Sequence, residues 1–201
     1  MSQIVLTADT LVTGPAPGAF EYDGAAMYAT PATSQRGLIA TDQLVIQQAT
    51  YTLTSQTAAQ KLFNATSNGQ VTLTTGTFAF ECFFSLSSMS ATSGSFGFAL
   101  GGTATLTQYW WADAQKGTAT LATATATQTT FNTAANTALA TASVNTVGYA
   151  KIGGTIVVSV AGTVIPQVSL GVAAAAVVGV GSYFRIRPLG STSVVSVGNW
   201  S

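Results

Sequence analysis

The chain has 201 residues, of which 47% are hydrophobic and only 6% are charged, and it contains no histidine. Its six basic and six acidic residues give a formal net charge of +0, which argues against the basic surface that nucleic-acid binding needs. General acid–base catalysis draws on His, Asp, Glu and Lys, so this composition also argues against an enzyme.

The scarcity of charge predicts an assembly. A soluble monomer normally covers its surface with charged side chains, so a chain with this few is expected to bury much of its surface against other subunits. No membrane insertion is expected, because the longest apolar run, Leu170 to Val180, is well short of the ~20 residues that span a bilayer. Met1 to Leu6 lacks the basic start of a signal peptide, and it is typical of a short strand.

The first predicted part of the chain is residues 1–46. Within it, two short runs of strand-forming residues, 20–22 and 27–29, flank Asp23-Gly24. Asp and Gly both tolerate positive φ, so this dipeptide between alternating runs predicts a β-hairpin.

Glu21 and Asp23 stand two residues apart, so on a strand they would share a face, as the paired carboxylates of a glycosidase must. We favour a structural interpretation, with Asp23 forming the turn and Glu21 as a solvated strand residue. Asp42, Glu81 and Asp113 are isolated in the sequence, and one chain does not reveal whether any acidic pair converges.

Residues 47–70 are predicted as a connector. Tyr51 and Leu53 alternate like a strand, whereas Ala58, Leu62 and Phe63 have spacings compatible with a short helix, and both alternatives stay open.

Residues 71–201 are predicted as a β domain. The clearest strand follows Val71 and Leu73, with Phe78, Phe80, Cys82 and Phe84 on one face. Further short strands are expected at 96–100, 104–106, 156–160, 164–168, 184–186 and 195–197, and another in the Thr/Ala tract 118–127. Many short strands without helical periodicity predict an all-β fold, an antiparallel β-sandwich or jelly-roll-like domain.

Tyr109, Trp110 and Trp111 form the densest aromatic cluster. Neighbouring strand residues point to opposite faces, so at most one Trp belongs to the core and the other is a candidate for a subunit or glycan contact. Ordinary packing of the whole cluster is the competing interpretation.

Arg185 and Arg187 share a strand face opposite Phe184 and Ile186. We interpret them as salt-bridge partners of a neighbouring copy, with an acidic-glycan site as the alternative. Cys82 is the only cysteine, which excludes an internal disulfide and a multi-cysteine metal site, and its aromatic neighbours predict a packing role. No cofactor and no metal is expected.

The N-terminal part contains the stretch Pro17-Gly18-Ala19-Phe20-Glu21-Tyr22-Asp23-Gly24, followed by Tyr28 and Arg36-Gly37-Leu38-Ile39. This stretch resembles an element of tailed-bacteriophage fibre and virion-surface proteins. In those families such a stretch commonly precedes a compact C-terminal β domain. The residue patterns of 78–106 and 182–186 are also similar to those of such domains.

This resemblance implies a non-enzymatic virion structural protein, assembled in the cytoplasm of the host bacterium and displayed on the virion surface. It implies a homotrimer, whose N-terminal hairpin (Phe20, Glu21, Tyr22, Asp23, Gly24, Tyr28 and Arg36) attaches to other virion proteins and whose β domain forms a knob. Closure around a three-fold axis would hide weakly charged faces and strand edges.

Because the sequence holds no extended shaft and no large anchoring domain, two roles stay open. One is a short fibre or spike that contacts a glycan on the host surface, and the other is a capsid decoration protein. A polysaccharide-degrading tailspike, which would need converging carboxylates, ranks below both.

Overall fold

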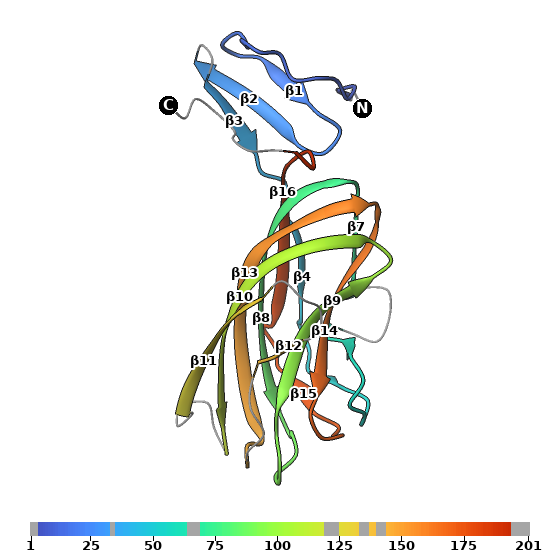
Figure 1. Ribbon diagram of the computed structural model, residues 1–201, viewed down its shortest axis with the longest axis vertical. Coiled ribbons are helices and arrows are strands. Elements are labelled where there is room, and N and C mark those ends of the chain that lie inside the picture. Colours follow the sequence, from blue (N-terminus) through green and yellow to red (C-terminus); the bar gives the residue numbers. More distant parts are fainter. Residues whose placement is uncertain are drawn as a thin grey trace.

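The computed structural model describes residues 4–32, 35–63, 69–118, 125–132, 137–139 and 144–193. Throughout these residues the fold is all-β and every strand pair is antiparallel, as the sequence predicts. Two large sheets pack face to face as a β-sandwich, and a small three-stranded sheet lies at one end of it (Figure 1). The jelly-roll order of strands stays a prediction. No helix in the described part of the chain is long and apolar enough to cross a membrane.

The small sheet contains the predicted hairpin. Its strands are β1 (Phe20–Tyr22), β2 (Met27–Ala32) and β3 (Gln35–Ile39). Phe20 pairs with Ala29, and the Asp23 carboxylate closes the turn by accepting the backbone N–H groups of Ala25 at 2.8 Å and Ala26 at 2.7 Å. Gly24 has a φ of 91°, which a side chain would strain. The hairpin and the turn-forming role of Asp23 are therefore confirmed.

The larger sheet of the sandwich has eight strands. They are β4 (Gln43–Ile46), β5 (Tyr51–Thr52), β8 (Gly76–Ser87), β10 (Thr105–Gly117), β11 (Thr125–Asn132), β13 (Val147–Val160), β15 (Val177–Val178) and β16 (Tyr183–Gly190). Its centre runs β10-β13-β8-β16-β4. Alternate residues of β8 are buried from Gly76 to Leu86, which confirms the clearest predicted strand.

The facing sheet has five strands. They are β6 (Gln60–Lys61), β7 (Val71–Leu73), β9 (Phe96–Gly102), β12 (Thr137–Ala138) and β14 (Gly162–Leu170). The core lies between the sheets, where the Phe84 ring of β8 is 5.8 Å from Phe96 and 6.4 Å from Phe98 of β9. Cys82 is fully buried beside them, and burial raises the pKa of its thiol, which accords with the predicted packing role.

The segment 47–63 contains two short strands and no helix, so the helical alternative is wrong for its described part. Leu53, Leu62 and Phe63 are all buried in the sandwich core. The Gln60 amide holds the intervening loop, because it donates to the Thr54 carbonyl at 3.0 Å and accepts the Thr54 N–H at 2.8 Å. The segment predicted as a connector therefore contributes side chains to the core of the sandwich.

Strand β4 joins the predicted N-terminal segment to the sandwich. Although residues 43–46 fall within 1–46, they pair with β16 at the edge of the large sheet. Two other expectations, the strand at 195–197 and residues 119–124 of the Thr/Ala tract, lie outside the described residues. The end of that tract forms the start of β11.

Candidate functional site

Four of the five predicted contact residues, all except Trp110, lie on the outward face of the eight-stranded sheet. On β10, Trp110 is fully buried, whereas Tyr109 and Trp111 are 48% and 40% exposed. One Trp therefore belongs to the core while the other faces outward, which confirms the prediction. On β16, Arg185 and Arg187 are exposed and alternate with the buried Phe184 and Ile186, also as predicted.

Strand register sets these side chains in two neighbouring rows that cross four strands. One row is Trp111, Gly153, Glu81 and Arg185. The next row is Tyr109, Thr155, Ala79 and Arg187. Each row thus has an aromatic ring at one end and a guanidinium at the other, with small or acidic residues between them.

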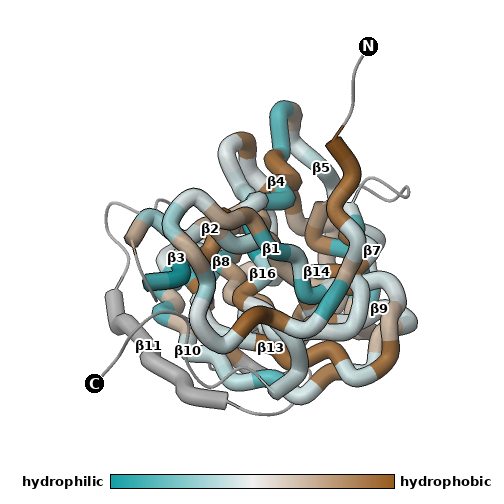
Figure 2. Tube along the Cα trace, turned by 90° about the horizontal axis from the view of Figure 1, so that it is seen from above, coloured by the Kyte–Doolittle hydropathy of each residue, from teal (hydrophilic) through white to brown (hydrophobic). Residues whose placement is uncertain are grey.

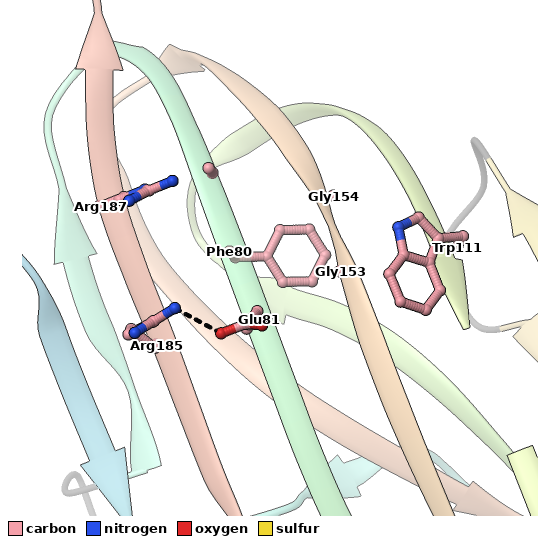
Figure 3. Close-up of a pocket in the computed structure, with 8 residues that line it drawn as sticks. Phe80, Glu81, Trp111, Gly153, Gly154, Arg185 and Arg187 are labelled. Atoms are coloured by element: carbon pink, nitrogen blue, oxygen red, sulfur yellow. Dashed lines mark hydrogen bonds and ion pairs between the residues drawn. The ribbon is translucent and has the colours of Figure 1, made fainter. Parts of the chain in front are cut away.

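A hollow of about 220 Å³ lies between the two ends of these rows. Figure 3 shows Trp111 on one side, Arg185 and Arg187 on the other, and Gly153 and Gly154 between them. On this outward face β13 has no side chain at Gly153, while its neighbours in the row, Trp111 on β10 and Glu81 on β8, are large, so the sheet is hollowed there. A Cβ on Gly153 would lie 3.4 Å from Cζ2 of Trp111, so the indole packs closely beside the bare backbone.

Arg185 is neutralised within its own chain. Its Nη2 donates to Oε2 of Glu81 at 2.6 Å (Figure 3). Its Nη1 lies 3.8 Å from Oδ2 of Asp42. The interpretation of Arg185 as the partner of a neighbouring copy is therefore not needed to balance its charge. These side chains are 36–44% exposed, so the pairs contribute at most about 1 kcal/mol each. Arg187 has no ion-pair partner among the described residues.

An aromatic group beside these rows was missed at the sequence level. On the same face, the Phe83 ring lies 6.0 Å from Tyr149 and 6.2 Å from Tyr183, with their centroids in the range of stacking pairs. The signal was present, because Phe83 alternates with the inward Cys82 and Phe84. Its neighbours come from other strands, so only the sheet register brings the three rings together.

The predicted attachment residues mostly hold the small sheet together. Tyr22 donates its hydroxyl to the Gly24 carbonyl at 3.0 Å. Tyr28 is buried, donates to Oδ2 of Asp23 at 3.0 Å, and lies 3.5 Å from the Leu189 carbonyl of the sandwich. Phe20 differs from them because its side chain is 65% exposed and so remains available to a partner.

Glu21 lies on strand β1 as predicted, but its side chain is an ion-pair partner of Arg36 and not a solvated group, so that part of the interpretation is wrong. Its carboxylate accepts Nε of Arg36 at 2.8 Å, Nη2 of Arg36 at 3.0 Å and the Val12 N–H at 2.9 Å. The side chains of Arg36 and Glu21 are only 16% and 13% exposed. Asp23 is held in the turn by donors of its own, so these two carboxylates are not arranged as an acid–base pair.

The Glu21–Arg36 pair predicts an acid-sensitive small sheet. The hydrogen bond from Arg36 is the main cause that lowers the pKa of Glu21 below its ordinary value of 4.5. A carboxyl whose pKa falls on folding stabilises the fold above its unfolded pKa, and this contribution is lost as the pH falls through the folded-state value. We therefore expect the small sheet to lose stability below about pH 4.5, measured by hydrogen exchange or unfolding between pH 7 and pH 3.

Glu21→Gln should be less stable than wild type at pH 7. It should also lack the loss of stability that protonation of Glu21 causes in the wild type below about pH 4.5. Asp42→Asn is the control, because it removes an exposed carboxylate that makes only a long contact. Parallel pH profiles for wild type and Glu21→Gln would contradict the prediction.

The outward sheet face can bind a ligand only through its own side chains and backbone, as far as the described residues show. No three His, Cys, Asp or Glu side chains of the described residues are grouped so as to hold a metal ion. Comparison with known proteins identifies no matching family model, no matching curated protein and no matching solved structure. The function is therefore inferred from the surfaces themselves and from the sequence resemblance.

Proposed function

We propose that the chain is a non-enzymatic structural protein of a tailed-bacteriophage particle, a homotrimeric short fibre or spike that attaches the particle to the host surface. The resemblance of residues 17–24, Tyr28 and 36–39 to phage virion-surface proteins supports this function. Two surfaces of the molecule support it as well, one apolar and one aromatic and cationic.

The observation that carries the proposal is the apolar surface near the N-terminus. Ile4, Val5, Val12 and Phe20 are all more than half exposed. Figure 2 shows a hydrophobic stretch beside the N label, at the rim of the molecule seen from above. Exposed apolar side chains grouped in one segment are typical of a surface that another chain covers. We assign this surface to contacts between copies and with the particle.

The outward sheet face favours host attachment over a purely decorative role. Aromatic side chains on a rigid sheet provide stacking surfaces, and a guanidinium beside them adds a polar contact. Asp42 and Glu81 converge on this face, but each forms an ion pair with Arg185. Because neither carboxylate is arranged with the other across a sugar-binding space, this argues against a tailspike that cleaves polysaccharide.

The test is the mass of the purified protein by light scattering behind a sizing column, followed by binding to host cells and to empty capsids. We expect a trimer that binds cells, and a Val12→Asp/Phe20→Asp variant that is a folded monomer. Val180→Asp, at an equally exposed valine of the sandwich, is the control and should remain trimeric. Binding to capsids alone would favour decoration, whereas a wild-type monomer would overturn the assembly.

A further inference from the structure

We propose that the hollow between Trp111 and Arg187 binds one carboxylated pyranose unit, a uronic or sialic acid, of a host polysaccharide. This site rests on the attachment function proposed above and gives it a ligand class. Four features of the hollow lead to that class: its size, its charge, its aromatic wall and its remaining hydrogen-bonding groups.

The size suits a single sugar ring. The volume of about 220 Å³ lies below the roughly 300–1,000 Å³ of pockets that enclose drug-sized ligands. The hollow is set in a sheet face, and its floor is the backbone of Gly153 and Gly154. A chain of sugars could therefore lie across the sheet and place one unit in the hollow.

The charge of the site calls for one negative group. The residues that line the hollow include one carboxylate, Glu81, and two guanidiniums. Glu81 pairs with Arg185, whereas Arg187 on the same wall has no ion-pair partner among the described residues. A guanidinium matches the two oxygens of a carboxylate with two parallel hydrogen bonds. A phosphate dianion carries two negative charges, but of these two guanidiniums only Arg187 is unpaired, and the second charge would be repelled by the Glu81 carboxylate. A ligand with a single negative charge therefore fits the site better.

Trp111 adds the contact that a small inorganic anion could not use. Its indole is 40% exposed and stands across the hollow from the arginines (Figure 3). A pyranose has a face of C–H groups that can pack on an aromatic ring while its substituents point sideways. A unit that rests on Trp111 can thus direct its carboxylate toward Arg187.

Glu81 provides an acceptor for the sugar hydroxyls. Its Oε2 accepts from Arg185, which leaves Oε1 to accept from a ligand. The Arg185 contact also fixes the Glu81 side chain before any ligand arrives, and an ordered side chain loses less entropy on binding. The hollow therefore offers a cation, an aromatic wall and a positioned acceptor to a single ligand unit.

The test is an NMR titration at physiological salt with oligomers of glucuronic, galacturonic and sialic acid, each paired with its carboxyl-reduced counterpart. We expect at least one acidic oligomer to bind about tenfold or more tightly than its reduced form, and to shift the Trp111 indole signal. Arg187→Gln should abolish that preference, and Arg187→Lys should restore only part of it. Trp111→Ala should weaken the acidic and the reduced oligomer alike.

The matched control is Lys61→Gln, which removes the same charge from β6 in the other sheet and should bind like wild type. Circular dichroism of each variant separates a lost contact from a lost fold. Three results would overturn the site: no binding of any acidic oligomer, equal binding of the reduced forms, or tighter binding of inorganic phosphate or an acidic peptide.

Cell binding distinguishes this site from the proposed function. If the wild-type protein binds host cells and Arg187→Gln binds them equally well, the sugar site is wrong and the attachment function remains. If acidic oligomers bind through Arg187 but the protein binds no host cells, the site remains and the attachment function is wrong.

Discussion

Trp110→Ala is expected to destabilise the sandwich by about 3–5 kcal/mol, the range for truncating a buried aromatic side chain. Trp110 is fully buried, and its ring packs edge-on against Phe98 of the facing sheet with centroids 5.5 Å apart. Its Nε1 also donates to Oε1 of the buried Gln108 at 3.0 Å. Truncation would open a cavity between the sheets and leave the Gln108 oxygen without this donor.

The measurement is the free energy of unfolding from urea denaturation. Trp111→Ala is the matched control, because the neighbouring indole faces outward and its removal opens no cavity in the core. We expect that control to cost much less stability than Trp110→Ala. Equal losses for the two variants would contradict the assignment of Trp110 to the core.

Gly154→Ala is expected to have the second large effect, about 1–3 kcal/mol or more, as for other changes that overfill a packed site. A Cβ at Gly154 would lie 2.2 Å from the Tyr109 carbonyl oxygen and 2.6 Å from Cα of Trp110. These atoms belong to the backbone of β10, which pairs with β13 at this point. The clash can be relieved only if the two central strands move apart.

Gly153→Ala provides the control for Gly154→Ala within the same strand. Its Cβ would lie no closer than 3.4 Å to any neighbouring heavy atom, and that atom belongs to the Trp111 side chain. We expect Gly153→Ala to unfold close to wild type, while Gly154→Ala unfolds at distinctly lower urea concentration. A well-folded Gly154→Ala variant of wild-type stability would contradict the close approach of β10 and β13.

Much of the strand pattern could be predicted because a strand has a side-chain period of two. Alternation alone predicted that Phe78 to Cys82 would face the core on alternate positions and that the two tryptophans would face opposite sides. It likewise predicted that Arg185 and Arg187 would lie on the face opposite Phe184 and Ile186. The Asp23 turn was predictable for a different reason, since its carboxylate bonds to backbone groups only two and three residues away.

The segment 47–63 shows where local pattern was insufficient. Its strands are only two residues long, so neither helical nor strand periodicity can develop. The conformation is decided by burial of Leu62 and Phe63 in a core that other parts of the chain supply. The Glu21–Arg36 pair is similar, because its partners meet only when the third strand of the small sheet is in place.

The sequence by itself determined the all-β class, the hairpin, the opposite faces of the two neighbouring tryptophans and the shared face of Arg185 and Arg187. Only the tertiary structure decided that Trp111, Gly153, Glu81 and Arg185 form one row, and that Arg185 is balanced by an acid 104 residues earlier in the chain. The reason is that alternation depends on the residue's own strand, whereas a row depends on which strands pair and in what register. Register is chosen by the packing of the whole sheet, to which every strand contributes.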